Sequence, residues 1–224
     1  KIIPSYMDFV DIAGLVQGAS KGEGLGNKFL GHIREVDAIA HVVRCFNDNN
    51  ITHVSSNIDP LSDIEIINTE LELADIETLE SKIISLEKKD KQGDKEIKNQ
   101  ISIVKKLIDT LNNNYSYKKN EFSEEDNEFI KSLNLIKIKP MVYICNVDEE
   151  SIQNGNELSK KVTEYANKNN HNSVIVSASI ESQIAELEND NEKAELIKEM
   201  GLNDTTLTKV IKSGYDLLNL INYF

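Results

Sequence analysis

The apolar residues of this sequence fall into short continuous runs and into longer stripes at helical spacing. The runs at residues 38–44, 141–145 and 173–177 predict buried β-strands, and residues 7–12 form a further, partly alternating strand candidate. Polar residues and then a helical pattern follow the two later runs. Because strands and helices alternate, the predicted fold class is α/β, with a mainly parallel sheet and flanking helices.

A different pattern occupies residues 63–122. Apolar residues recur there at helical spacing along two long segments, separated by Gly93 and Asp94. They are Ile64, Leu71, Ile76, Leu79, Ile83, Leu86, Ile97, Ile101, Val104, Ile108 and Leu111. The short, irregular repeat favours two helices that pair within the chain over an extended dimeric coiled coil. We therefore expect an inserted α-helical hairpin (coiled-coil) domain between two parts of the sheet domain, residues 1–62 and 123–224.

Glycines and helix-capping residues mark further boundaries. Five glycines lie between residues 14 and 26, and apolar residues then follow at helical spacing up to Ile33, which predicts a loop and a helix. Ser123 precedes three acidic residues, a pattern typical of a helix start. Residues 206–220 predict a closing amphipathic helix.

Composition limits the classes of protein that this chain can represent. Its 224 residues are 39% hydrophobic, enough for one sizeable core with an insertion. No apolar run approaches the roughly 18 residues of a membrane helix and no signal-like region opens the chain, so we expect a cytoplasmic protein without a membrane partner. Cys45 and Cys145 each end an apolar run, which favours two packed thiols over a disulfide.

The net charge of -13 argues against a general electrostatic grip on nucleic acid, and no sequence-specific DNA binding is expected. One basic cluster lies where the chain turns between the two hairpin helices. It comprises Lys88, Lys89, Lys91, Lys95 and Lys98. The cluster predicts either a contact with RNA or the ribosome, or an ordinary solvated helix tip in which Asp90 and Asp94 are interspersed.

Ligands of parallel α/β sheets bind beyond the carboxyl ends of the strands, where residues 11–14, 146–149 and 177–179 are polar candidates. The first of these, D-I-A-G, matches D-x-x-G. In that pattern the carboxylate, here Asp11, holds Mg²⁺ through water, and the amide of Gly14 meets the terminal phosphate of a nucleoside triphosphate. On its own, such a short pattern also fits a strand that ends in an ordinary glycine turn.

The surrounding residues resemble the second switch of Obg-related GTPases. The stretch D-I-A-G-L-V-Q-G-A-S-K-G-E-G-L-G-N-K-F-L carries this resemblance, and I-R-E-V-D-A-I-A-H-V-V-R-C-F resembles the YchF branch, the Obg-like ATPases. Similar segments continue with I-E-I-I-N-T-E-L, Y-I-C-N-V-D-E and G-Y-D-L-L-N-L-I-N-Y-F, so the resemblance spans essentially the whole chain. It implies part of a P-loop NTPase G domain that binds ATP and Mg²⁺.

Ordinary GTPases read guanine with N-K-x-D, whose aspartate accepts hydrogen bonds from a ring N–H and from the exocyclic amine. The sequence here is N-V-D-E, which places Asn146, Val147 and Glu149 at the base. The longer side chain of Glu149 should disturb a bidentate fit to guanine. The resemblance implies a preference for ATP over GTP, with Asn146 and the backbone around Val147 reading adenine. The alternative is an asparagine turn that only ends the strand.

Two further roles are implied by the resemblance. Ser177 and Ala178 occupy the place of the last base-contacting loop, although Ser177 alone would be expected to cap the following helix. Leu15 stands where many GTPases have a water-orienting glutamine, and His53, in the loop after the next strand, is the implied catalytic residue. A solvated loop histidine is the alternative for His53, and His41, inside a strand run, is expected to be structural.

The sequence contains no phosphate-binding loop of the form G-x-x-x-x-G-K-[ST], and the family's C-terminal TGS domain is missing as well. We therefore expect the complete protein to be a Mg²⁺-dependent ATPase associated with the ribosome, and this stretch alone to be inactive. Two alternatives stay open. One is a helical-hairpin adaptor whose nucleotide is an occupancy signal, and the other is a GTPase.

Overall fold

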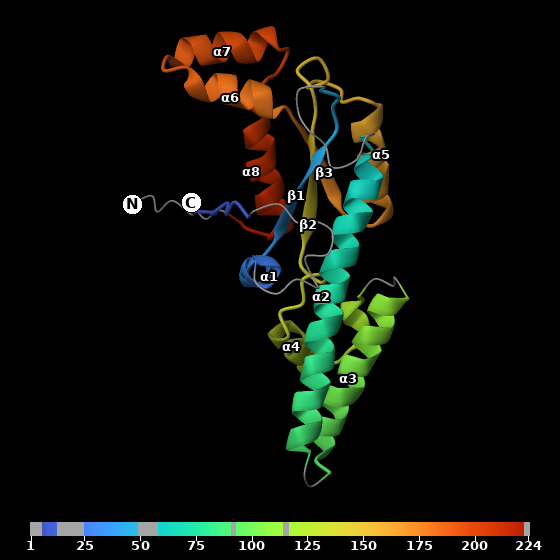
Figure 1. Ribbon diagram of the computed structural model, residues 1–224. Helices are drawn as coiled ribbons and strands as arrows, with labels where there is room; N and C mark the ends of the chain where they lie inside the picture. The colour runs from blue at the N-terminus through green and yellow to red at the C-terminus, as the bar shows by residue number, and fades with distance from the viewer. Residues whose placement is uncertain (1–5, 13–24, 49–57, 91–92, 114–116, 222–224) are drawn as a thin grey trace, which may run out of the picture. The chain divides into compact units, whose positions relative to one another are not determined.

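The computed structural model describes residues 6–12, 25–48, 58–90, 93–113 and 117–221 (Figure 1). The chain divides into two compact units, which are described separately. The sheet unit comprises Lys1–Phe9, Asp37–Glu65 and Pro140–Phe224, and the hairpin unit comprises Val10–Val36 and Ile66–Lys139. The boundaries predicted after residues 62 and 122 stay a prediction. No helix in the described ranges is long and apolar enough to cross a membrane.

Three parallel strands form the core of the sheet unit. They are β1 (Ile39–Arg44), β2 (Met141–Asn146) and β3 (Asn172–Val176), in the spatial order β1-β2-β3. Every residue of β2 before Asn146 is buried, as expected of a continuous apolar run at the centre of a sheet. The predicted α/β class with a parallel sheet is confirmed.

Further helices of the sheet unit follow β2 and β3 along the chain. They are α5 (Glu157–Lys168), α6 (Ala178–Glu186), α7 (Asp190–Glu199) and α8 (Thr206–Leu217). Figure 1 shows α5 and α8 on opposite sides of the strands. The helix predicted at residues 206–220 is therefore present, and it ends at Leu217. This arrangement leaves the turns after β2 and β3 together at one end of the sheet.

The strand predicted at residues 7–12 is wrong. Residues 6–12 are not in a strand, and Tyr6 and Phe9 are exposed. Met7 instead passes close to α8, where a Cβ atom added at Gly214 would lie 2.8 Å from the Met7 sulfur. A strand is stable only when its backbone groups pair with a neighbour, and in the described part of the chain this segment pairs with none.

The hairpin unit consists of helices. They are α1 (Leu25–Glu35), the larger part of α2 (Pro60–Lys89), α3 (Lys95–Asn112), the short 3-10 turn η2 (Lys119–Glu121) and α4 (Glu124–Ser132). The described residues on either side of the α2–α3 turn include Gly93, which has a φ of 74°, and Asp94, whose carboxylate accepts from the Glu96 amide at 2.9 Å. Ser123 caps α4 by accepting from the Asp126 amide at 3.1 Å. The predicted helix start at Ser123 is confirmed, whereas the capping role of Asp94 was not predicted.

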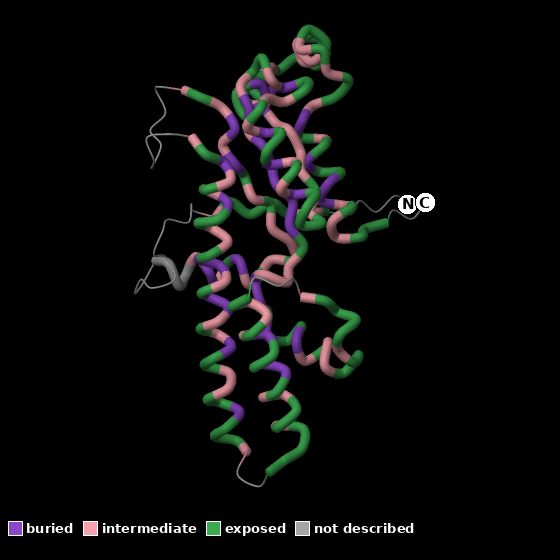
Figure 2. The backbone as a smooth tube through the Cα atoms, turned by 90° about the vertical axis from the view of Figure 1, so that its right-hand side faces the viewer, coloured by how far each residue is buried: buried purple, intermediate pink, exposed green. Residues whose placement is uncertain are grey.

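Leucine and isoleucine side chains hold these helices together, and Figure 2 shows buried positions alternating with exposed ones along α2 and α3. The buried cluster comprises Leu79, Leu86, Ile103, Val104, Leu107, Ile130, Leu133 and Leu135. At about 25 cal/mol per Å² of apolar surface, burying a leucine or isoleucine stabilises the folded state by roughly 1.5–3 kcal/mol. The predicted stripe from Leu79 to Leu111 thus packs in the cluster that α2 and α3 share, and α4 extends it, whereas Ile64, Leu71 and Ile76 lie outside this cluster.

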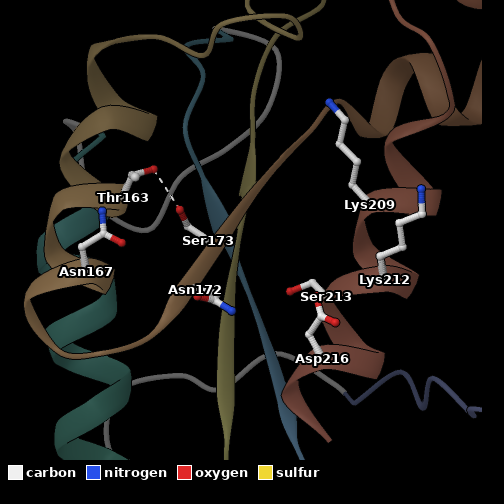
Figure 3. Close-up of a pocket in the computed structure, with 8 residues that line it drawn as sticks. All are labelled: Thr163, Asn167, Asn172, Ser173, Lys209, Lys212, Ser213 and Asp216. Carbon is white, nitrogen blue, oxygen red and sulfur yellow. Dashed lines mark hydrogen bonds between the residues drawn. The ribbon is translucent and has the colours of Figure 1, made fainter. Parts of the chain in front are cut away.

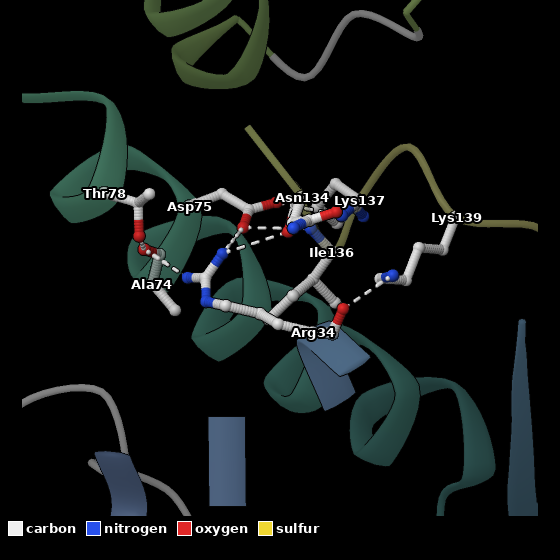
Figure 4. Close-up of polar contacts among 8 residues, drawn as sticks. All are labelled: Arg34, Ala74, Asp75, Thr78, Asn134, Ile136, Lys137 and Lys139. Atoms are coloured by element: carbon white, nitrogen blue, oxygen red, sulfur yellow. Dashed lines mark hydrogen bonds and ion pairs between the residues drawn. The ribbon is translucent and has the colours of Figure 1, made fainter. Parts of the chain in front are cut away.

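One buried ion pair ties α1 to α2 (Figure 4). Arg34 Nη1 lies 3.1 Å from Asp75 Oδ1, and Asp75 is fully buried. The same carboxylate accepts hydrogen bonds from the backbone N–H groups of Ile136 at 3.0 Å and Lys137 at 2.9 Å. The guanidinium also donates to the carbonyl of Ala74 at 3.0 Å. These donors compensate the free-energy cost of burying the charged carboxylate.

Candidate functional site

Two loops meet at the carboxyl end of the sheet. Asn146 is the last residue of β2, and Ser177 and Ala178 connect β3 to α6. The side-chain oxygen of Asn146 accepts a hydrogen bond from the Ala178 N–H at 3.0 Å. Since β2 and β3 are parallel and Asn146 is paired with Val176, their ends lie side by side. The structure therefore brings together three residues that the sequence analysis assigned to base binding.

Val147 continues the core rather than opening toward solvent. Its side chain is buried, and its N–H donates to the carbonyl of Val176 at 2.8 Å. In N-K-x-D the corresponding residue is a lysine, so the valine replaces a long cationic side chain with an anchored apolar one. Because the Val147 N–H is engaged, a backbone contact to adenine at this residue would fall to its carbonyl oxygen.

Asn156 braces the loop that follows β2. Its side-chain N–H group donates to the carbonyl of Cys45 at 2.7 Å and lies 3.5 Å from an oxygen of Asp148. Its side-chain oxygen accepts from the Ser159 amide at 2.9 Å and so caps α5. One side chain thus links the end of β1, the base-loop candidate and a helix. Sequence reasoning missed Asn156, although N-x-x-S before an amphipathic segment is a capping-box signal.

Glu149 is exposed and turned toward α6. Its Oε1 atom accepts hydrogen bonds from Ser179 Oγ at 2.5 Å and from Gln183 Nε2 at 2.8 Å. Ser179 lies in the candidate stretch 177–179, whereas Gln183 was not identified from the sequence. Its spacing of four residues from Ser179, which places the two on one face of a helix, is the signal that could have found it.

Ser177 does not cap α6, although a serine just before a helix is ordinarily expected to do so. The side chain is fully buried and makes no capping hydrogen bond. Within the described chain, its hydroxyl has no hydrogen-bond partner. A buried hydroxyl without a partner costs free energy, so a serine at this point is unusual for a helix start. The part of Ser177 in base binding stays a prediction.

The phosphate half of the predicted site is only partly described. Asp11 is exposed and belongs to the hairpin unit, whereas Gly14 and His53 lie outside the described residues. The described ranges hold no group of three or more His, Cys, Asp or Glu side chains placed to bind a metal ion. A magnesium ion held by one carboxylate through water needs no such group, because Mg²⁺ keeps most of its water ligands. Asp11, Gly14, His53 and Mg²⁺ stay predictions.

A polar recess of about 400 Å³ lies elsewhere on the sheet unit (Figure 3). It is lined by Thr163, Asn167, Asn172, Ser173, Lys209, Lys212, Ser213 and Asp216. Asn172 and Ser173 begin β3, whereas Ser177 follows the other end of the same strand. The recess and the two candidate base loops are therefore at opposite ends of β3, and the recess is not the predicted base site.

Comparisons with known proteins agree with the sequence resemblance. A family model described as "50S ribosome-binding GTPase" matches residues 3–69. The chain is 48% identical to the ribosome-binding ATPase YchF of Bacillus subtilis and 50% identical to that of Haemophilus influenzae. Both matches cover 100% of this chain and 62% and 61% of the relatives, so the chain spans less than two thirds of their length. The solved structure of the Schizosaccharomyces pombe YchF GTPase is similar with a TM-score of 0.78 and 34% identity, over 95% of this chain and 58% of that one.

Proposed function

Because this chain belongs to the YchF family along its whole length, we propose that it carries the base-binding and switching parts of a Mg²⁺-dependent hydrolase that uses ATP in preference to GTP. The observation that supports this most directly is the hydrogen bond between Asn146 and Ala178. It joins two loops at the end of a parallel sheet where nucleotides bind in this fold class.

Base recognition follows from the chemistry of these loops. The oxygen of Asn146 is occupied by Ala178, so its amide N–H₂ group is the part that can donate to a purine ring nitrogen. Adenine presents an amine donor and ring-nitrogen acceptors, which suit an amide donor and a backbone carbonyl. Guanine needs a carboxylate that accepts two N–H groups, and Glu149 is held by α6 instead.

Hydrolysis would use residues from the switch segment. Asp11 would hold Mg²⁺ through water, and the N–H of Gly14 would contact the terminal phosphate. His53 would orient the attacking water, since Leu15 has no hydrogen-bonding group. Bound Mg²⁺ would neutralise charge on the phosphates. Phosphoryl transfer depends mainly on positioning and charge stabilisation, so these residues act chiefly by geometry.

The experiment uses the protein expressed from its complete gene. ATP and GTP compete for binding, and phosphate release is measured for wild type and for His53→Ala. We expect tighter ATP binding, and turnover that falls at least about 10-fold in the variant. The isolated 224-residue chain is expected to release no phosphate, because its sequence contains no phosphate-loop lysine. Equal affinities would overturn the ATP preference, and unchanged turnover in His53→Ala would remove His53 from the reaction.

A second role is favoured by the charges at the hairpin tip, where α2 ends and α3 begins. In this role the tip would dock onto the cytoplasmic ribosome. Lys88, Lys89 and Lys95 are exposed. The neighbouring acids are engaged with the backbone, because Asp90 accepts from the Asp94 amide at 2.9 Å and Asp94 caps α3. The lysines are therefore available to phosphates of ribosomal RNA, and this contact would weaken as salt rises.

A charge-reversal comparison tests this docking role. Lys88→Glu with Lys89→Glu is compared with Lys160→Glu with Lys161→Glu, a matched pair of adjacent exposed lysines on α5. Co-sedimentation with ribosomes is measured at increasing salt. We expect the hairpin variant to lose binding and to show a shallower salt dependence, with the α5 variant close to wild type. Equal binding by both variants would exclude the hairpin tip as the contact.

A further inference from the structure

The carboxylate of Glu149 is held by two donors from a single helix. Ser179 Oγ and Gln183 Nε2 both donate to its Oε1 atom, at 2.5 Å and 2.8 Å. Gln183 Nε2 also lies 3.4 Å from Ser179 Oγ, so the three side chains form one small network. The acceptor in this network is a charged carboxylate oxygen. Hydrogen bonds from a hydroxyl or an amide to such an oxygen are stronger than those to a neutral acceptor.

Buried packing fixes α6 against the loop that carries Glu149. Ile180 and Ile184 point into a hydrophobic cluster with Ile152, which lies three residues after Glu149. Ser179 and Gln183 each precede one of these isoleucines and therefore share an adjacent face of the helix. The isoleucines set the rotation of α6, and that rotation presents the two donors to Glu149.

Guanine recognition by a carboxylate requires both of its oxygens, one for the ring N–H and one for the exocyclic amine. Here Oε1 is already occupied, so guanine would have to displace Ser179 and Gln183 before it could bind in this way. Adenine has no ring N–H to present at that edge and gains nothing from the carboxylate. The network therefore penalises guanine and leaves adenine unaffected.

We propose that Ser179 and Gln183 are specificity-determining positioning residues, which withhold Glu149 from guanine and so favour adenine nucleotides. This inference rests on the proposed nucleotide-binding function. The inference attributes the preference for adenine nucleotides to two causes. One is the pair of hydrogen bonds from Ser179 and Gln183 on α6, and the other is the extra methylene group of Glu149. The side chains act through Glu149 rather than by touching the base.

The test measures ADP and GDP affinities of the protein expressed from its complete gene by displacement of a fluorescent nucleotide. We expect Ser179→Ala with Gln183→Ala to raise GDP affinity relative to ADP at least about 5-fold, with ADP affinity nearly constant. Gln100→Ala is the matched control, because Gln100 donates to a glutamate one turn away on α3, in the hairpin unit. The nucleotide ratio of this control should equal that of wild type.

A second variant separates specificity from a structural role. Adding Glu149→Ala to the double variant should abolish the gain in GDP affinity, since the released carboxylate is its cause. An unchanged ratio in the double variant, or a gain that persists without Glu149, would overturn the inference. If the wild-type protein bound neither nucleotide, the proposed function would be overturned as well. That result is distinguishable from one in which nucleotides bind but Ser179 and Gln183 have no effect on specificity.

Discussion

The side-chain oxygen of Asn146 lies 3.0 Å from the backbone nitrogen of Ala178, so one asparagine at the end of β2 holds the first residue of α6. Thirty-two residues separate the two in sequence. The contact uses the acceptor half of the amide and leaves the donor half for a ligand. Asn146 is therefore both a structural link between two loops and a candidate base-binding group, and these two roles can be separated by substitution.

Asn146→Asp should separate them. The aspartate keeps an acceptor for the Ala178 N–H but has no donor for a purine nitrogen, so we expect near-wild-type thermal stability and ADP affinity reduced at least about 10-fold. Asn146→Ala should lose both properties. Calorimetric titration and thermal unfolding measure the two effects. Asn172→Ala, an exposed asparagine at the opposite end of β3, is the control and should bind ADP normally. Undiminished affinity in Asn146→Asp would exclude the donor role.

The parts of the fold that the sequence predicted depend on local pattern. Continuous apolar runs identified the three paired strands, and the cap Ser123 was predicted because a helix start is set by residues a few positions apart. The strand prediction for residues 7–12 is wrong because a strand also needs a pairing partner, which a run of six residues does not reveal.

The parts that were missed depend on distant contacts. Asp75 reads as one of many acids on a long helix, yet its backbone donors are 61 and 62 residues away. Likewise, the contact of Glu149 with Gln183 follows from the rotation of α6, which buried isoleucines set. Motif spacing in the sequence marked the two candidate base loops, and their role in base binding stays a prediction. The sequence did not predict which neighbouring side chains orient them.

The two cysteines should be unreactive in the folded protein. Cys45 and Cys145 are both free and fully buried, which confirms the sequence prediction of two packed thiols. A hydrogen bond with Cys145, together with burial, raises the pKa of the Cys45 thiol, and the thiolate is the reactive form. Iodoacetamide followed by intact-mass measurement should give no adduct on native protein and two adducts in denaturant. An adduct on the folded chain would contradict this burial.

His41 should make the fold sensitive to mild acid. Burial lowers the pKa of His41 to about 4, opposed by the charge of Asp63. The folded pKa is therefore below the unfolded value of about 6.5. The unfolded state binds the proton more readily, so the stability that the neutral ring contributes is present above about pH 6.5 and is lost as the pH falls toward 4.

The measurement is urea unfolding at about pH 7 and pH 5. We expect wild type to lose about 1–2 kcal/mol more over this interval than His41→Phe, which keeps a ring against Tyr143 but does not titrate. His32→Gln, at an exposed position of α1, is the control and should follow wild type. An equal loss in wild type and His41→Phe would show that the proton is taken up elsewhere.

The buried pair of Arg34 and Asp75 should be coupled to pH in the opposite direction. Burial raises the pKa of Asp75, and the backbone N–H groups of Ile136 and Lys137 and then the charge of Arg34 lower it. Arg34→Met removes that charge while keeping an apolar stem, so the pKa of Asp75 should rise further. A carboxyl group with a raised folded pKa favours folding when protonated, and that contribution is lost as the pH rises through the folded pKa.

We therefore expect Arg34→Met to lower the free energy of unfolding by about 3 kcal/mol near pH 7 and by clearly less near pH 4, where Asp75 is closer to neutral. Combining it with Asp75→Asn should cost less than the two single changes together, because no unpaired charge then stays buried. Lys106→Met removes one member of the half-exposed pair with Glu121 and should cost less than about 1 kcal/mol at either pH. A pH-independent loss in Arg34→Met would mean that the arginine stabilises α1 and α2 by packing and backbone contacts, rather than by compensating the buried carboxylate.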